Sequence, residues 1–104
     1  MNRSYDNIPM PAFMIVDIDI RDLPAYAEYA KQVPALVQKH GGSYLARGGK
    51  TEVMEGDWTP HRIALFQFPD MAAIRAFLDD PEYLPLKAIR HRVAKTNAIA
   101  VEGV

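Results

Sequence analysis

Apolar and polar side chains alternate along residues 13–20, which read FMIVDIDI. A period of two is typical of a β-strand, because successive side chains point to opposite faces of a sheet. One face is wholly apolar and carries Met14, Val16, Ile18 and Ile20. The other face starts with Phe13 and Ile15 and ends in Asp17 and Asp19, so we expect it to be covered near its start and wet near its end.

A helical repeat of apolar residues follows this strand. It consists of Leu23, Tyr26, Ala27, Ala30, Val33 and Val37. Asp22 is placed to cap the start of the helix, and Gly41 falls where the helix ends. Pro34 interrupts the pattern, because an internal proline removes a hydrogen bond and clashes with the preceding turn. We therefore predict a kink, or two short helices joined near Val33.

The middle of the chain is predicted to be β-structure on both sides of a loop. Residues 43–55 are strand-like around Gly48 and Gly49, and residues 56–61 form a loop rich in turn formers. Residues 62–68, RIALFQF, are apolar on both faces, as expected for an inner strand of a sheet that is covered on both sides. The glycine pair is interpreted as a tight turn or a bulge that bends a long strand.

Two short helices and a final strand complete the pattern. Asp70 is a plausible cap for the first helix, and the Asp79-Asp80-Pro81 sequence ends that helix and caps the next, which runs to Val93. The last strand is expected at residues 96–101.

The order of these elements predicts an α+β ferredoxin-like fold, βαββαβ, with helices covering one face of a four-stranded antiparallel sheet. The opposite face would expose a contiguous apolar patch, so we predict a homodimer that packs sheet against sheet. Residues 1–9 are expected to form a flexible tail, with Met1 or Met10 as the native start, and residues 10–104 a single domain.

Composition narrows the function classes. The chain has 104 residues, of which 49% are hydrophobic and 24% charged, and a formal net charge of −1. These values are typical of a globular protein and argue against a nucleic-acid partner, which needs a basic surface. No apolar stretch is long enough to span a membrane and no signal peptide is recognisable, so we expect a cytoplasmic protein without a membrane partner. The absence of cysteine excludes disulfides and thiol chemistry.

Gly49-Lys50-Thr51 resembles the end of a phosphate-binding loop, but two features exclude that site. The first glycine of the motif is replaced by Tyr44, and the residues that follow are strand-like rather than helical. Nucleophile elbows are absent around Ser4 and Ser43. Hence neither a nucleotide loop nor a hydrolase triad is predicted.

The three histidines, His40, His61 and His91, lack the short spacings of metal ligands. Capping or surface roles are expected for them, and we predict neither a metal nor an organic cofactor. Haem binding through one histidine stays a less favoured alternative, testable by a Soret shift.

Charged and aromatic residues gather at the ends of the predicted elements. Arg47, Glu55, Trp58 and Arg62 bracket the strand ends, while Tyr83 and Arg90 share one face of the last helix. The alternative to a binding site is an ion pair between an arginine and Glu55 that ties the sheet to a helix.

Three segments, residues 40–49, 53–70 and 79–94, together resemble the family of domains of unknown function DUF 1330, within the dimeric α/β-barrel superfamily. The likeness runs from about Met10 to Gly103. Its hallmark positions match at Tyr29, Pro34, Gly41, Gly42, Tyr44, Arg47, Gly48, Gly49, Glu55, Gly56, Trp58, Pro60, Arg62, Phe68, Tyr83 and Arg90. Phe77 departs from a position that is often tryptophan-like in the family. The resemblance implies the fold and a dimer through the sheet, and it implies no activity.

We hypothesise that the chain is a small-molecule-binding protein. If it is catalytic, we expect a cofactor-independent enzyme of the isomerase, lyase or monooxygenase type that acts on a small enolisable or aromatic acid or ketone. Its predicted catalytic residues are Glu55, Arg90 and Arg47. Its predicted substrate-binding residues are Arg62, Trp58, Tyr83, Tyr44 and His40. The alternative is a non-catalytic binding or stress-associated homodimeric module.

Overall fold

The computed structural model describes residues 10–104, so the tail predicted for residues 1–9 lies outside the described residues. Four strands and three helices follow one another in the described chain. They are β1 (Ala12–Ile20), α1 (Leu23–Lys39), β2 (Ser43–Arg47), β3 (Ile63–Phe68), α2 (Met71–Leu78), α3 (Leu84–Val93) and β4 (Ala94–Glu102).

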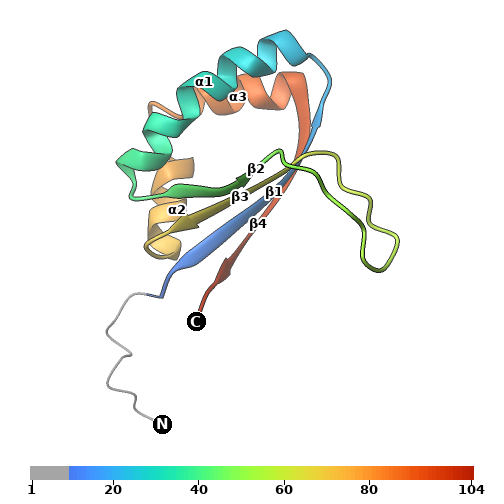
Figure 1. The fold of residues 1–104 in the computed structure, drawn as a ribbon. Coiled ribbons are helices and arrows are strands. Elements are labelled where there is room, and N and C mark those ends of the chain that lie inside the picture. Colours follow the sequence, from blue (N-terminus) through green and yellow to red (C-terminus); the bar gives the residue numbers. More distant parts are fainter. Residues whose placement is uncertain (1–9) are drawn as a thin grey trace.

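The strands form one antiparallel sheet in the order β2-β3-β1-β4, and the three helices lie over one of its faces (Figure 1). The two central strands are therefore β1 and β3, and their order along the chain is that of a ferredoxin-like fold. This confirms the predicted fold class. The second helical segment is divided into α2 and α3, as the Asp79-Asp80-Pro81 sequence indicated.

The core lies between the helices and the inner face of the sheet. Alternate residues of β1 and β3 are buried there, from Met14 to Ile18 and from Ala64 to Phe68. The helices contribute the apolar stripes that the sequence predicts, including Val33, Val37, Phe77, Leu86 and Val93. Among the described residues, no helix is both long and apolar enough to cross a bilayer.

We predicted a kink or two short helices near Val33; helix α1 is one continuous helix of 17 residues, so the second of these alternatives is wrong. Its start and end agree with the sequence: the Asp22 side chain accepts the Ala25 N–H, and Gly41, at φ 77°, follows the last turn. Pro34 lies inside the helix and provides no N–H for the carbonyl of Ala30, four residues earlier. That carbonyl finds a donor elsewhere, as described below.

Strand β2 ends at Arg47, which corrects the prediction of a strand over residues 43–55. A bulge at Leu45 shifts its register against β3, and Gly48, at φ 70°, turns the chain away while its N–H still bonds the Ile63 carbonyl at 2.8 Å. Residues 49–61, here called the arm, then project from the end of the sheet (Figure 1). Residues 49–55, which were predicted to continue the strand, have no neighbouring strand in the described chain to pair with and are irregular, and residues 56–61 form the predicted loop.

The outer face of the sheet carries an apolar row across three strands. Ile15 pairs with Leu65 on one side and with Ile99 on the other, so the three side chains lie next to one another. Ile99 is 63% exposed, and Val101 on the same strand is 48% exposed. No element of the described chain covers this face (Figure 1).

Candidate functional site

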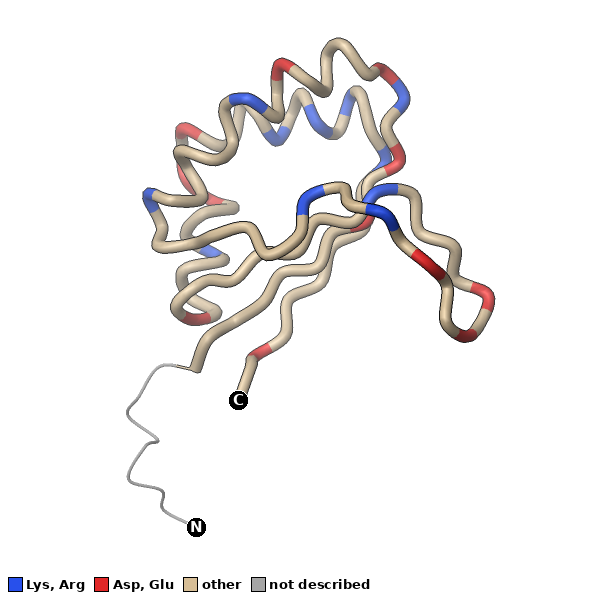
Figure 2. The backbone as a smooth tube through the Cα atoms, viewed as in Figure 1, with Lys and Arg blue, Asp and Glu red and all other residues tan. Residues whose placement is uncertain are grey.

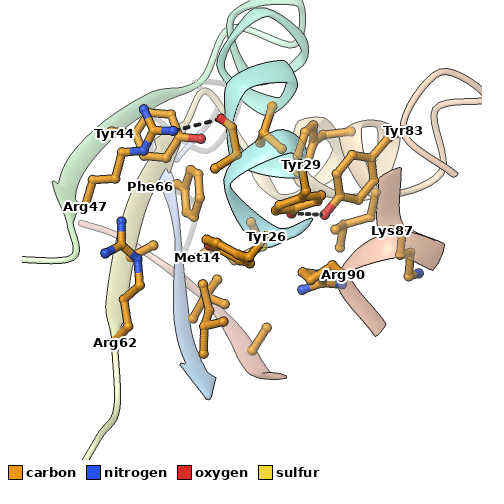
Figure 3. Close-up of a pocket in the computed structure, with 18 residues that line it drawn as sticks. Met14, Tyr26, Tyr29, Tyr44, Arg47, Arg62, Phe66, Tyr83, Lys87 and Arg90 are labelled. Atoms are coloured by element: carbon orange, nitrogen blue, oxygen red, sulfur yellow. Dashed lines mark hydrogen bonds between the residues drawn. The ribbon is translucent and has the colours of Figure 1, made fainter. Parts of the chain in front are cut away.

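A cavity of about 240 Å³ lies between the helices and the inner face of the sheet (Figure 3). Its walls come from all parts of the fold: β1 and β3 form the floor, α1 and α3 the roof, and β2 one side. The lining residues are Met14, Val16, Ile18, Tyr26, Tyr29, Ala30, Val33, Tyr44, Arg47, Arg62, Ala64, Phe66, Phe77, Leu78, Tyr83, Lys87, Arg90 and Ala98.

Aromatic rings form a layer beside the cavity. The Tyr44 and Phe66 ring centroids are 4.6 Å apart, and those of Phe77 and Tyr83 are 4.5 Å apart. Phe77 is 1% exposed and lines the cavity itself. The Phe77 ring therefore shapes the wall of the cavity, and a phenyl ring at this position leaves more room than an indole would.

Every charged side chain that the described residues contribute to the lining is a cation: Arg47, Arg62, Lys87 and Arg90. Within residues 10–104, no aspartate, glutamate or histidine belongs to this lining. Arg47 and Arg62 lie at the end formed by β2 and β3, while Arg90 and Lys87 come from α3 at the other end (Figure 3). Several of the acids lie on the arm instead (Figure 2).

Arg90 is the buried cation of this set. It lies on the buried face of α3 with Leu86 and Val93, and only 8% of the residue is exposed. Its Nε has no hydrogen-bond partner among the described residues, and there its guanidinium makes only one long contact, 3.4 Å from Nη2 to Nε2 of His91. A buried charge is normally paired, so an unpaired guanidinium facing a cavity indicates a place for an anion.

Arg47 is exposed, and its guanidinium already makes contacts within the protein. Nη2 donates to the Ala30 carbonyl at 2.9 Å, which is the carbonyl left free by Pro34. Its Cζ also lies 4.7 Å from the centre of the Tyr44 ring, a cation–π contact. Arg47 thus ties β2 to α1 at the mouth of the cavity.

Arg62 makes no ion pair with the described residues, and its position depends on Gly48. A Cβ added to Gly48 would overlap the Arg62 guanidinium. The glycine at the end of β2 therefore permits both the left-handed turn and the close approach of this cation to the mouth of the cavity.

Tyr29 and Tyr83 meet at the buried end of the cavity. Their hydroxyl oxygens are 2.9 Å apart, and the two residues are 6% and 2% exposed (Figure 3). Burial, followed by the neighbouring Tyr83, raises the pKa of Tyr29 well above its usual range, although Arg90 acts in the opposite direction. Sequence reasoning included Tyr83 in the site and missed Tyr29, whose helical spacing with Val33 and Tyr26 is equally typical of a core stripe.

Glu55 and Trp58 lie on the arm and do not line the cavity. Trp58 is 62% exposed, and its Nε1 donates to Asp17 at 3.2 Å. The backbone N–H of His61 donates to the same carboxylate at 2.9 Å. Burial opposes the ionisation of Asp17, but these hydrogen bonds prevail and lower its pKa. The base of the arm is therefore fixed to β1, while Glu55 itself is exposed.

His40 lies outside the cavity, where it joins α1 to the turn before α3. Its Nε2 is 2.7 Å from Oδ2 of Asp80, and Nζ of Lys39 donates to the same oxygen at 2.8 Å. Oδ1 of Asp80 accepts the Glu82 N–H. The bonds from Lys39, His40 and Glu82 hold the pKa of Asp80 far below its usual range. The structure thus gives His40 a contact that fixes the helices relative to one another.

Across residues 10–104, no three histidine, aspartate or glutamate side chains gather in a way that would hold a metal ion. The cavity suits an anionic ligand and not a metal cation. Its lining, within the described residues, offers hydrogen-bond donors but lacks the carboxylates that a hard cation needs.

A family model described as "Domain of unknown function (DUF1330)" matches residues 11–104. A comparison with curated proteins gives no match.

Three solved structures show the same fold. A protein of unknown function from Rhodopseudomonas palustris is 19% identical, with a TM-score of 0.74 over 91% of this chain and 83% of its own. A variant of the cofactor-independent oxygenase SnoaB from Streptomyces nogalater is 16% identical, with a TM-score of 0.65 over 89% and 92%. A dimeric protein of unknown function with a ferredoxin-like fold from Bacteroides fragilis is 17% identical, with a TM-score of 0.61 over 89% and 96%.

Proposed function

The chain belongs to the DUF1330 family, and from the geometry of its cavity we propose that it binds a small aromatic or enolisable acid or ketone between its helices and its sheet. The bound form is the anion, which is the carboxylate of an acid or the enolate of a ketone. The observation that carries this proposal is the set of four cations, with no acid from the described residues, around one cavity in which Arg90 is buried and its Nε lacks a partner. An anion would give these donors the partner that the described residues do not provide.

The size and walls of the cavity support a small ligand with a flat apolar part. At about 240 Å³, it lies below the range of about 300 to 1,000 Å³ that is common for drug-sized ligands. The side chains of Met14, Val16 and Phe66 form an apolar floor, and Tyr83 and Phe77 form a wall of neighbouring rings. These surfaces favour a planar aromatic or unsaturated group over a polar chain such as a sugar.

If the protein is an enzyme, we propose that it catalyses a reaction of the isomerase, lyase or monooxygenase type on this ligand. Each of these reactions can pass through an enolate, whose negative oxygen would be stabilised by the buried donors around Arg90. The structural likeness to a cofactor-independent oxygenase supports the same class, as an analogy of fold. The general-base role of Glu55 stays a prediction, since in a single copy this residue lies on the arm and outside the lining.

A binding role without catalysis is the second candidate, and one observation favours it. Among the described residues, no carboxylate or imidazole lines the cavity, so its walls hold no obvious general base. A stress-associated or carrier module would need only the cations and the apolar walls.

We also propose that the protein is a homodimer. The row formed by Ile15, Leu65 and Ile99 on the outer face of the sheet supports this assembly, because apolar patches of this kind are usually buried. The Bacteroides fragilis protein is described as dimeric, which agrees with the proposal.

Binding of benzoate, with neutral benzamide as its isostere, tests the proposed function by isothermal titration calorimetry. Benzoate should bind and benzamide should not, because only the carboxylate can pair with the cations. Arg62→Met removes the guanidinium at the mouth of the cavity and should weaken benzoate binding by about ten-fold or more, the loss expected for a hydrogen bond to a charged group. Arg92→Met, at an exposed arginine outside the lining, is the matched control. Equal affinity for benzoate and benzamide would overturn the proposal.

The role of Glu55 is tested with Glu55→Gln. Since the residue is exposed and outside the lining, benzoate affinity and the melting temperature should stay unchanged. A sharp fall in melting temperature would instead support the ion-pair role that the sequence left open.

A further inference from the structure

We propose that Tyr29, Tyr83 and Arg90 together form an oxyanion seat, which binds a single negatively charged oxygen of an enolate or a phenolate at the buried end of the cavity. This inference rests on the proposed function and deepens it, because it names the part of the ligand that each end of the cavity recognises.

The hydroxyl pair leaves one proton unused. In the 2.9 Å contact between Tyr29 and Tyr83, one hydroxyl donates and the other accepts. The accepting hydroxyl still carries its own O–H, and the described residues provide no other acceptor for it. Because both tyrosines line the cavity, this remaining O–H is available to a ligand.

Arg90 adds a second unused donor at the same end. Its Nε–H is buried and has no partner among residues 10–104. Tyr83 precedes α3 and Arg90 lies two turns further along, so the two side chains are on one face of the helix. Figure 3 shows Arg90 beside the tyrosine pair, with all three side chains on the same side of the cavity.

The seat offers protons and carries no negative charge. No carboxylate of the described chain lines the cavity, and the raised pKa of Tyr29 keeps its phenol protonated in the neutral pH range. Donors fixed in a buried site stabilise negative charge on an oxygen more strongly than water does, because they need no reorganisation.

The geometry points to one oxygen rather than to a carboxylate. A carboxylate is best matched by the two parallel N–H groups of a guanidinium, and Arg62 supplies such a fork at the opposite end of the cavity. At the buried end, a hydroxyl and an Nε–H come from different side chains and can converge on one atom. The wall of Phe77 and Tyr83 rings beside them suits the flat group to which an enolate or phenolate oxygen is attached.

A titration with 4-nitrophenol, which turns yellow when it ionises, tests the seat. Binding should favour the phenolate, so the apparent pKa of the bound probe should fall and yellow colour should appear at a lower pH than in free solution. Tyr29→Phe together with Tyr83→Phe should reduce affinity for the phenolate by about ten-fold or more. Arg90→Lys keeps the charge but removes the Nε–H, and it should also reduce the shift. Arg92→Lys, the same change at an exposed position outside the lining, should not.

The outcomes separate this inference from the proposed function. If benzoate binds and depends on Arg62, but the double tyrosine variant binds 4-nitrophenolate like the wild type, the seat is wrong and the proposed function stands. If neither anion binds, the proposed function fails as well. Circular dichroism and urea unfolding establish that the double variant is folded, and the single variants Tyr29→Phe and Tyr83→Phe extend the test should the double variant be unstable.

Discussion

The guanidinium of Arg47 donates a hydrogen bond of 2.9 Å to the carbonyl of Ala30. This carbonyl would accept from residue 34 in a regular helix, but residue 34 is a proline. A side chain of β2 therefore replaces a backbone donor of α1, and the helix continues through Pro34 without a break. A predicted catalytic arginine thus also has a role in holding the helix to the sheet.

The first prediction is that the loss of folding stability caused by replacing Arg47 depends on the presence of Pro34. Arg47→Met should destabilise the protein by about 0.5 to 1.5 kcal/mol, the usual net value of a hydrogen bond. In a Pro34→Ala background the cost should be smaller, because the substituted residue regains a backbone N–H that can bond the Ala30 carbonyl and only the contact of Arg47 with the Tyr44 ring is lost. Urea unfolding of the four proteins of this double-mutant cycle measures the difference. An equal loss of stability from Arg47→Met in both backgrounds would contradict the interpretation. Lys50→Met is the control, since Lys50 is exposed and makes one local ion pair.

The second prediction concerns the glycine pair. Gly48→Ala should cost about 1 to 3 kcal/mol, because residue 48 has φ 70°; the new Cβ would also displace the flexible Arg62 guanidinium. Gly49→Ala is the matched control, since a Cβ at that position meets nothing within 4 Å. Its effect should stay within about 0.5 kcal/mol. Chemical denaturation compares the two, and similar losses would show that neither the turn nor Arg62 sets the requirement.

The third prediction is a loss of stability in acid that depends on Asp80. Its folded pKa lies below the unfolded value of about 3.9, so the unfolded state binds more protons and stability falls as the pH decreases. The contribution of Asp80 should be complete above about pH 5 and should decline below about pH 4. Asp80→Asn should be less stable than the wild type at pH 7, and the difference should narrow toward about pH 2.

Urea midpoints measured from neutral pH down to strong acid test this dependence. Asp79→Asn is the control, because Asp79 caps the end of α2 through its backbone and has no side-chain bond in the described structure. A gap between Asp80→Asn and the wild type that is constant with pH would contradict the prediction.

The fourth prediction tests the dimer. Ile99→Glu should yield a monomer, because it places a charge in the apolar row beside Ile15. The fold of the single chain should stay intact, because the Ile99 side chain is 63% exposed there. Light scattering at micromolar concentration should give twice the chain mass of 11.7 kDa for the wild type and the single mass for the variant. Leu84→Glu, 49% exposed on α3, should stay dimeric. A monomeric wild type would refute the sheet-mediated dimer.

Local patterns in the sequence were sufficient for most of the fold. Alternation located β1 and β3, and the caps at Asp22 and Asp70 located the starts of α1 and α2. The continuity of α1 through Pro34 was not predictable, because the donor that makes it possible is 17 residues away from Ala30 in the sequence. Patterns within one element carry no information about a partner supplied by another.

The same limit explains the errors and omissions at the site. Residues 49–55 were predicted as strand, yet strand formation requires a neighbour, and the described sheet offers them none. The pair of Tyr29 and Tyr83 joins residues 54 positions apart, so neither tyrosine alone suggests it. Arg90 was identified from its position on a helix face, and only the fold shows that it is buried without a partner for its Nε among the described residues.

The position of β1 at the centre of the sheet has a consequence for synthesis of the protein. β1 is the first of the described strands to leave the ribosome, but β4, which pairs with it from Ala12 opposite Glu102 to Ile20 opposite Ala94, is the last of them. The edge of β1 that pairs with β4 therefore stays unpaired until β4 has emerged, whereas β3 can pair with the other edge earlier. Chaperones that hold nascent chains have their longest opportunity at this strand.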